Sequence, residues 1–303
     1  MIIVSITGPR INDAFAQVAS STRYADIFEF RLDHIEEPPL SMLLSSTRKP
    51  FIATCRPKWE GGRFDGTEHE RMQILEAASV LGASYVDLEL KTEKAFLKEF
   101  LNRRNESKVI LSHHQFAGER IAPSKVYARM RALGADIFKF VYAADDVSDI
   151  RHAITFLKLA KGDGQKAVAI AMGEYGEPTR ILYKKFGGWG TYAATEDGKS
   201  SAPGQIPASE LKELYRSEHI SSRTKLFGVI GNPLKQSKGV YIHNPLFYRA
   251  KRNSVYCRLP VKNLRTFVKE VAPFLSGFSV TIPHKQAMMK YLDRVDATAS
   301  AIG

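Results

Sequence analysis

Short apolar runs alternate with amphipathic segments along the first 215 residues of the chain. The apolar runs predict strands over residues 2–6, 27–32, 51–55, 85–90, 109–112, 137–142, 167–172 and 190–194. Apolar positions at three- and four-residue spacing predict helices over residues 68–81, 93–103, 124–133, 147–159 and 208–215. Eight strands, each followed by a helix or a crossover of helix length, are typical of an α/β fold of the (β/α)8 TIM-barrel type. An open, doubly wound sheet is the alternative that this pattern leaves.

A second, smaller α/β domain is expected after the barrel. Residues 216–224 are polar, and a new strand-like run follows at 226–231. Further strands are predicted over 254–259 and 277–282, and helices over 243–251, 262–271 and 283–292. The predicted division is a barrel over 1–218, a linker over 219–224 and an incomplete domain over 225–303.

A lysine interrupts the sixth predicted strand. Lys139 lies within the apolar run Ile137–Val141, where the interior of a strand would normally carry no charge. A lysine that is buried in this way can lose its proton and become a nucleophile. Taken alone, Lys139 has an equally simple structural interpretation, as an ion-paired or snorkelling group.

Ionisable residues in several other predicted strands lie on the same face as Lys139. Strand side chains point alternately to two faces, and one face carries Glu29, Arg31, Asp87, Glu89, Ser112, His114 and Lys139. Large apolar residues occupy the other face, which must pack against helices, so we expect the ionisable set to point into the barrel. His113 falls on the outer face, which makes His114 the better catalytic candidate. Glu29 with Arg31 can also be read as a structural ion pair.

The residue types limit the chemistry. The sequence has no GxSxG elbow, no P-loop, no close pair of metal-ligand histidines and no cysteine cluster, so metal hydrolysis, serine acyl transfer and nucleotide phosphoryl transfer lack their parts. An amine for a Schiff base, a histidine for proton transfer and arginines for a carboxylate remain. The set predicts elimination or aldol cleavage of a keto acid without a metal.

Composition and charge indicate which partners and which compartment to expect. The formal charge is +12, but the basic residues are scattered without a long block, which argues against a nucleic-acid partner. Two distant cysteines suit a reducing compartment, and the first ten residues read as a strand and not as a targeting leader. No stretch approaches the roughly 20 apolar residues of a membrane span. A cytoplasmic enzyme of small molecules is expected, with a homodimer left open.

Several motifs carry a family resemblance. EFRLDH, RPxWEGG, DLEL, SHHxF, the lysine strand DIFKF and SSAPGQ, in this order, resemble the type I 3-dehydroquinate dehydratases over residues 1–215. Downstream, FGVIGNPLKQSKGVYIHNPLF and GFSVTIPHKQA resemble the substrate-binding half of shikimate dehydrogenases, fused as in plant-type bifunctional enzymes. The resemblance implies a multifunctional lyase of the shikimate pathway and aromatic amino-acid biosynthesis. Its substrates would be 3-dehydroquinate, 3-dehydroshikimate, and shikimate or quinate.

The resemblance also implies roles for particular residues. Lys139 matches the lysine that forms a Schiff base with the C3 ketone of 3-dehydroquinate, and His114 matches the histidine that removes a C2 proton and protonates the departing C1 hydroxyl. Glu89 matches the carboxylate that orients this histidine. The substrate-binding set would be Ser5, Glu29, Arg31 and Arg56 for ring hydroxyls, Arg180 for the carboxylate, and Ser201 and Gln205 in a closing lid. This step needs no cofactor.

In the second domain, Ser237 matches a serine that holds the shikimate carboxylate, Thr281 a hydroxyl ligand and Lys285 the catalytic lysine. Gly239 stands where the family usually has a second serine, and a roomier site that accepts quinate is a hypothesis. The dehydrogenase family uses NADP, but the chain has no GxGxxG loop, so hydride transfer is not expected from it alone. The rival interpretations are another Schiff-base aldolase or decarboxylase, and a non-catalytic protein that binds a shikimate-pathway acid.

Overall fold

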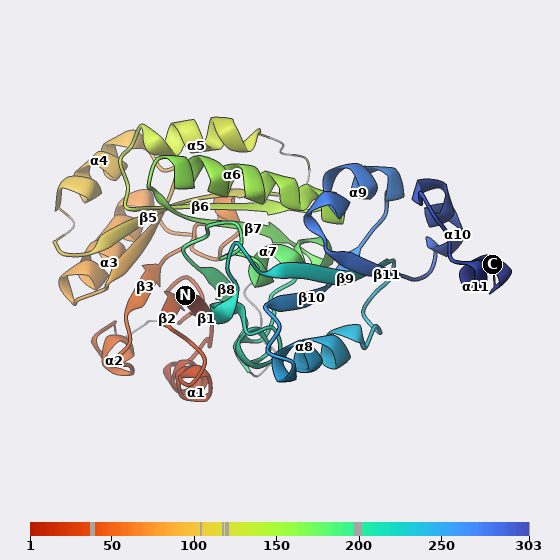
Figure 1. Cartoon of the computed structure of the whole chain (residues 1–303). Helices are drawn as coiled ribbons and strands as arrows, with labels where there is room; N and C mark the ends of the chain where they lie inside the picture. The colour runs from red at the N-terminus through yellow and green to blue at the C-terminus, as the bar shows by residue number, and fades with distance from the viewer. Residues whose placement is uncertain (37–39, 104, 117, 119–120, 197–201, 303) are drawn as a thin grey trace.

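The computed structural model describes residues 1–36, 40–103, 105–116, 118, 121–196 and 202–302. Eight parallel strands form a nearly closed barrel, seen on the left of Figure 1. They are β1 (Ile2–Ile6), β2 (Ile27–Arg31), β3 (Phe51–Thr54), β4 (Tyr85–Glu89), β5 (Lys108–Gln115), β6 (Ile137–Ala143), β7 (Lys166–Met172) and β8 (Thr191–Ala193). The predicted barrel is confirmed, and the open doubly wound sheet is excluded.

The strand order explains how the barrel closes. Each strand from β1 to β6 pairs with the next one in sequence, so that β7 is reached, and β8 returns to pair with β1, with Ile3 opposite Tyr192. The remaining seam lies between β7 and β8, where the backbone N–H of Trp189 donates to the carbonyl of Ala167 at 2.8 Å. The eight strands therefore bring all their C-terminal ends to one rim.

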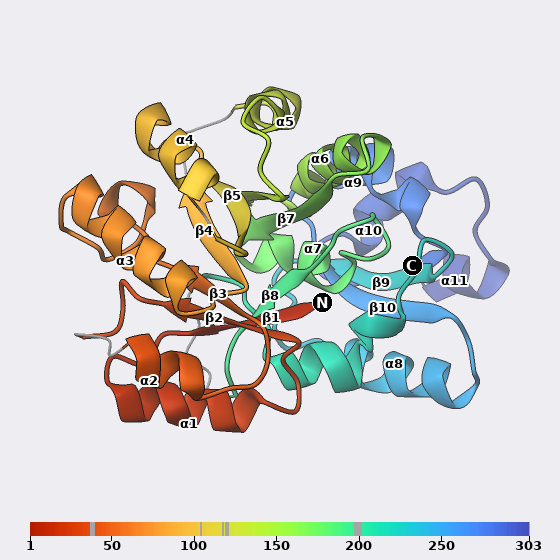
Figure 2. The ribbon, with the colours of Figure 1, turned by 90° about the vertical axis from the view of Figure 1, so that its left-hand side faces the viewer.

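Helices surround the strands, as Figure 2 shows in a view from the end of the molecule where the barrel lies. They are α1 (Ile11–Ser21), α2 (Leu40–Ser45), α3 (Glu68–Val80), α4 (Lys94–Arg103), α5 (Pro123–Arg131), α6 (Ile150–Gly162) and α7 (Glu177–Ile181). Phe138 and Phe140 belong to the core between strands and helices, whereas Ile137 and Val141 belong to a separate cluster inside the barrel. This separation confirms the predicted facing of β6.

Three predicted elements of the barrel differ from the structure in their ends or type. Helix α6 begins and ends three residues later than the predicted 147–159, because Val147–Asp149 is a 3-10 turn. β5 continues to Gln115 and not to Ser112, because His113 and His114 still pair with Phe140 and Val141 of β6. The predicted helix over 208–215 is a π-helix over Glu210–Leu214. Polar residues at the end of β5 conceal the strand in the sequence, although its backbone pairing continues.

The second unit is a three-stranded parallel sheet with helices. Its strands are β9 (Lys225–Gly231), β10 (Ser254–Pro260) and β11 (Gly277–Val280), in the order β10-β9-β11. Its helices are α8 (Gly239–Arg249), α9 (Leu264–Glu270), α10 (Lys285–Met288) and α11 (Ala297–Ile302). Helix α8 starts four residues before the predicted start and contains Pro245, and the predicted helix over 283–292 is only α10 and a 3-10 turn, Met289–Tyr291.

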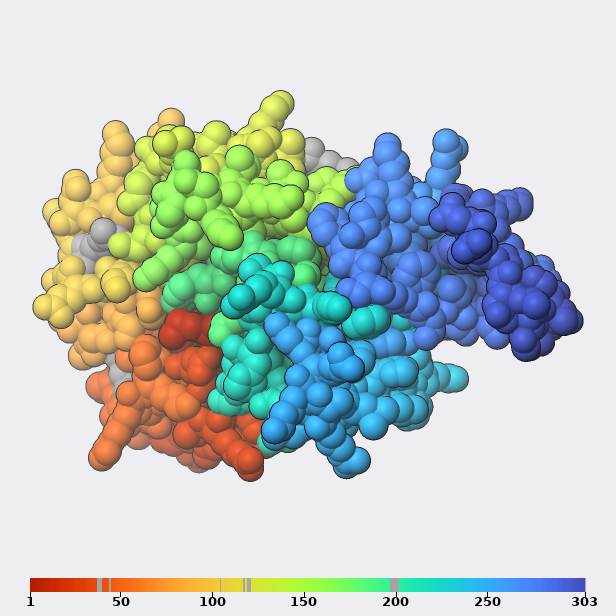
Figure 3. Space-filling model, in the orientation of Figure 1, coloured from red at the N-terminus to blue at the C-terminus, as the bar shows by residue number. Residues whose placement is uncertain are grey.

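The second unit packs on the barrel beside the turns that follow β6 and β7. Asp146 accepts hydrogen bonds from the backbone N–H groups of Lys262 (2.6 Å) and Asn263 (3.1 Å), and Arg258 lies 3.7 Å from Glu177. In Figure 3 the chain after α10 projects from the far end of this unit. None of the helices in the described ranges is long and apolar enough to cross a membrane.

Candidate active site

A cavity of about 150 Å³ lies at the C-terminal rim of the barrel. Its walls come from most of the barrel strands and from the loops that follow them. The residues that matter for chemistry are Glu29, Arg31, Arg56, Glu60, His114, Lys139, Arg180, Tyr192 and Gln205. The rim is the place where barrels of this type keep their reactive groups.

Lys139 extends into this cavity from the middle of β6. Its Nζ lies 2.9 Å from Asp87 Oδ2 and 3.3 Å from Glu29 Oε1, and 4.0 Å from the centroid of the Tyr192 ring. Burial alone would raise the pKa of Asp87, but Arg56 and Lys139 hold it below its ordinary value. The lysine therefore points inward, as predicted, and it is anchored by two carboxylates inside the barrel.

Glu89 has a different environment from the one predicted. Its carboxylate accepts hydrogen bonds from the buried guanidinium groups of Arg56 and Arg71, both at 2.5 Å. Arg71 belongs to α3 and also donates to Thr92 at 2.9 Å. Glu89 thus ties the barrel rim to a helix, and the prediction that it orients His114 is not what the structure shows.

The carboxylate beside His114 belongs to Glu60. Glu60 ends a 3-10 turn, Lys58–Glu60, that follows β3, and its Oε1 accepts a hydrogen bond from the His114 backbone N–H at 2.6 Å. Nδ1 of the same histidine lies 3.4 Å from this oxygen. An imidazole that donates from Nδ1 keeps Nε2 free to accept a proton. His113, in contrast, is buried on the outer face and stacks on Phe140.

Burial shifts the pKa values of His114 and Glu60. Burial lowers the pKa of His114 well below its ordinary value, and the cations Arg56, Lys139 and Arg31 add to this effect. The imidazole is therefore neutral near pH 7 and able to act as a base. Burial also raises the pKa of Glu60 to about 7, against hydrogen bonding and the attraction of Arg56, which act in the opposite direction.

Glu60→Gln should flatten the pH dependence of stability. The folded protein keeps a proton on Glu60 that the unfolded chain releases above about pH 4.5, so stability from this group is present below that pH and is lost as the pH rises to about 7. The loss amounts to roughly 3 kcal/mol of unfolding free energy. Urea unfolding at pH 4.5, 6 and 7.5 measures it.

The matched control is Glu93→Gln, which neutralises an exposed glutamate before α4. The control should follow the wild-type curve between pH 4.5 and 7.5. A Glu60→Gln variant whose unfolding free energy falls with pH as steeply as that of the wild type would contradict the assignment of this proton to Glu60.

The predicted substrate-binding residues around the cavity differ in how many of their polar groups are already bound within the protein. Arg180 is buried, donates to the carbonyls of Tyr192 (3.1 Å) and Pro203 (3.4 Å), and its Nε has no partner among the described residues. Burial lowers the pKa of Arg180 to about 10, which marks a cation short of counter-charge. Ser5 donates to Glu29 at 2.6 Å and so reaches the cavity only through that carboxylate.

Arg31 lines the cavity and is held by Asp33, to which it donates two hydrogen bonds at 2.7 and 2.9 Å. Arg56 also lines it but is committed to Asp87 and Glu89. Gln205 reaches the cavity from the segment that precedes the π-helix. Ser201, the other predicted lid residue, lies outside the described residues.

Comparison with known proteins agrees with this geometry. The family model described as type I 3-dehydroquinase matches residues 2–222. The chain belongs to the type I 3-dehydroquinase family. A second model, the shikimate dehydrogenase substrate binding domain, matches residues 229–303.

Proteins similar to this chain include a fused protein and a shorter one within the type I 3-dehydroquinases. The chain is 37% identical over 287 residues to a bifunctional 3-dehydroquinate dehydratase/shikimate dehydrogenase of Arabidopsis thaliana, with 92% of this chain and 47% of the relative covered. It therefore spans about half the length of that relative. A 3-dehydroquinate dehydratase of Methanococcus maripaludis is 35% identical, with 71% of this chain and 99% of the relative covered.

A crystal structure of a type I 3-dehydroquinate dehydratase from Clostridium difficile, with covalently modified comenic acid, superposes with a TM-score of 0.64. The two chains are 25% identical, and the match covers 71% of this chain and 90% of that one. The barrel is thus the part of the chain that the dehydroquinase fold accounts for.

Beyond the type I 3-dehydroquinase barrel, Ser237 and Thr281 lie at one edge of the small sheet. Ser237 follows β9 and Thr281 follows β11, and these two strands are neighbours. Lys285 is exposed at the start of α10. A Cβ on Gly239 would lie 3.0 Å from the ring of Tyr256, so Tyr256 already fills the space expected there, and a roomier site is not supported at this point.

Sequence reasoning missed two residues of the dehydroquinase site. Asp87, the nearest carboxylate to the Lys139 amine, was expected to face inward but had no assigned role. Glu60 stands inside the motif RPxWEGG, so the signal was present in the sequence. Its reach to His114 depends on a turn that no strand pattern predicts. Among the described residues, no cluster of His, Cys, Asp and Glu could hold a metal ion.

Proposed function

We propose that this chain dehydrates 3-dehydroquinate to 3-dehydroshikimate through a Schiff base on Lys139. The observation that supports the proposal most is that the amine of Lys139 shares one buried cavity with the imidazole of His114 and the guanidinium of Arg180. These groups supply a nucleophile, a proton-transfer group and a counter-charge for a carboxylate. An elimination from a keto acid needs all three.

The Lys139 amine adds to the C3 ketone, and loss of water leaves an iminium. Before it attacks, the amine must give up a proton, and the carboxylates of Asp87 and Glu29 lie within hydrogen-bond distance to exchange it. The positive iminium then takes the place of the ammonium between the same two carboxylates. Their negative charge stabilises it, and it acidifies the protons on C2.

His114 then moves protons in both directions. Its neutral imidazole removes a C2 proton, and the resulting imidazolium protonates the C1 hydroxyl, which departs as water. We assign Glu60 as the positioning residue for this histidine, because the Glu60 carboxylate is its partner at the backbone and at Nδ1. Hydrolysis of the conjugated iminium releases the enone and restores the Lys139 amine.

Arg180 is assigned to the substrate carboxylate, and Arg31 and Gln205 to ring hydroxyls. Arg180→Gln should lower kcat/KM for 3-dehydroquinate by about 10²-fold, chiefly through KM, because a charge-assisted pair contributes roughly 1.5–3 kcal/mol. Steady-state kinetics from enone absorbance measures it. Arg151→Gln, in α6, is the matched control and should match the wild type; equal KM values for all three proteins would refute the assignment.

We propose the division into a barrel over 1–218, a linker over 219–224 and a second domain over 225–303. The two family matches, which end at 222 and begin at 229, support it. In the second domain we assign Ser237, Thr281 and Lys285 to a hydroxylated carboxylate such as shikimate or quinate. The loops after its strands offer side-chain groups and no glycine-rich backbone cradle, so they do not fit NADP, and we assign no hydride step to these residues.

For the whole chain we propose a cytoplasmic location, which its two free, buried cysteines support. Small molecules are its assigned ligands, and a homodimer stays a prediction. The test of function is incubation with 3-dehydroquinate and product analysis. Appearance of the conjugated enone with loss of one water supports a dehydratase; carbon–carbon cleavage would indicate an aldolase, and binding without turnover would indicate a non-catalytic protein.

A further inference from the structure

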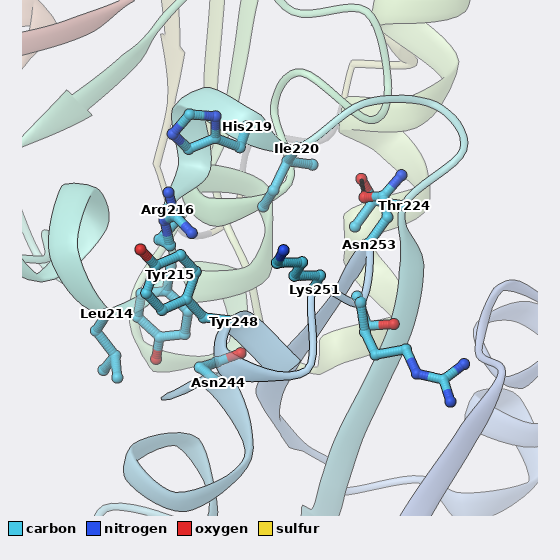
Figure 4. A pocket seen from close by; sticks show the side chains of 12 residues that line it. Leu214, Tyr215, Arg216, His219, Ile220, Thr224, Asn244, Tyr248, Lys251 and Asn253 are labelled. Carbon is cyan, nitrogen blue, oxygen red and sulfur yellow. Dashed lines mark hydrogen bonds between the residues drawn. The ribbon is translucent and has the colours of Figure 1, made fainter. Parts of the chain in front are cut away.

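A second and larger cavity lies outside the catalytic rim. It has a volume of about 390 Å³ and is formed by two segments: residues 214–224, which leave the barrel, and residues 244–254, which include the end of α8 and the turn into β10 (Figure 4). A molecule in this cavity would contact the barrel side and the second unit at the same time. None of the residues assigned to the proposed reaction lines it.

Four basic residues and no described Asp or Glu line this cavity. They are Arg216, His219, Lys251 and Arg252, and in Figure 4 the first three surround one opening. His219 lies 3.3 Å from Glu218, but Arg216, Lys251 and Arg252 form no ion pair with a carboxylate among the described residues. Arg216 and Lys251 line the same cavity without counter-charge, so their like charges repel one another, and an anion between them removes that repulsion.

The backbone gives an independent reason to assign a function to two of these cations. Among described residues other than glycine, only Arg216 (φ 49°) and Lys251 (φ 51°) have a positive φ, and both line this cavity. After α8 the N–H of Lys251 donates to the backbone carbonyl of Tyr248, and the N–H of Arg252 donates to the backbone carbonyl of Phe247. This pattern of hydrogen bonds ends a helix with a left-handed residue, here Lys251, at a position where glycine is usual. A basic side chain at a position that favours glycine costs conformational energy, and such costs gather at functional sites.

The walls around the cations are fixed by their own hydrogen bonds. The Asn244 carboxamide bonds to the backbone of Tyr256 at 2.8 and 3.0 Å, and Thr224 donates to Asn253 Oδ1 at 2.7 Å. The Arg216 guanidinium lies 3.9 Å from the centroid of the Tyr248 ring, which reaches it from α8. Stacking orients this guanidinium and leaves its N–H groups available for an anion.

We propose that this cavity binds a phosphate dianion, either free or as the phosphate group of a small organic monoester. The guanidinium of Arg216 and the ammonium of Lys251 suit the charge and the oxygen geometry of a phosphate dianion. The volume exceeds what inorganic phosphate alone needs, and the rings of Tyr215 and Tyr248 offer a surface for the organic part. The bound ligand would bridge the two units of the chain.

Calorimetric titration of the full chain with inorganic phosphate, and separately with glycerol 3-phosphate, tests the site at constant ionic strength in chloride. Arg216→Gly and Lys251→Asn should each weaken binding at least tenfold. Both replacements suit a left-handed backbone, so without ligand their thermal unfolding midpoints should equal or exceed that of the wild type. Arg223→Gln, which removes an exposed charge from the same segment but does not line the cavity, should bind as the wild type does.

Arg180→Gln separates this cavity from the catalytic one. Phosphate binding that persists in Arg180→Gln and is lost in Arg216→Gly supports the proposal, whatever substrate the barrel acts on. Tighter binding of glycerol 3-phosphate than of inorganic phosphate would identify the monoester as the better ligand, and the reverse would identify free phosphate. Undetectable binding of both by the wild type, or wild-type affinity in both Arg216→Gly and Lys251→Asn, would overturn it.

Discussion

Lys139→Ala should lower kcat for 3-dehydroquinate by a factor on the order of 10⁴ or more, the scale on which loss of a covalent nucleophile acts. Without the amine there is no iminium, and the C2 protons keep the weak acidity of protons beside a ketone. Borohydride reduction in the presence of substrate should then leave no stable adduct. Enone absorbance measures the first effect and intact-protein mass the second.

Lys166→Ala is the matched control, because Lys166 begins the neighbouring strand β7 but is exposed at the opposite rim. It should keep the wild-type rate and the wild-type adduct. Removal of Lys139 also leaves Asp87 and Glu29 without their shared cation, so a lower unfolding midpoint is expected. Efficient trapping of substrate by folded Lys139→Ala would contradict the assigned nucleophile.

His114→Ala should lower kcat by about 10²- to 10⁴-fold, which is the range that a positioned acid or base contributes. In contrast to the lysine variant, it should still form the imine, so borohydride should trap an adduct that does not turn over. The combination of a retained adduct and a lost elimination follows from the roles assigned to the two residues. Single-turnover kinetics measure the loss of elimination, and intact-protein mass measures the retained adduct.

The control is His152→Asn, which replaces a partly exposed histidine of α6. It should retain both adduct and rate. If His114→Ala kept more than a tenth of the wild-type kcat, or failed to form an adduct although folded, the division of labour between His114 and Lys139 would be wrong.

The sequence predicted the barrel because its strands are short apolar runs with a regular spacing. The same regularity predicted the facing of β6, since alternation forces Lys139 to the side of Ile137 and Val141 once Phe138 and Phe140 pack on helices. Strand ends were predicted less well. At the end of β5 the backbone continues to pair although its side chains become polar.

The site was predicted in part, and the error has a physical cause. Strand alternation correctly brought Glu29 to Lys139, because both belong to strands. It could not decide between Glu89 and Glu60 as the partner of His114. That choice depends on Arg71, which reaches Glu89 from α3, and on the turn that carries Glu60 over the rim. Both are features of packing between elements and not of any single strand.

Every step of the proposed dehydration follows from the capture of the substrate ketone by the Lys139 amine. The most direct measurement is reduction of the wild-type protein with borohydride during turnover of 3-dehydroquinate, followed by peptide mass spectrometry. We expect one modified lysine, Lys139, with the mass of a reduced product imine. A stable adduct on another lysine, or turnover that continues under borohydride with no adduct at all, would contradict it.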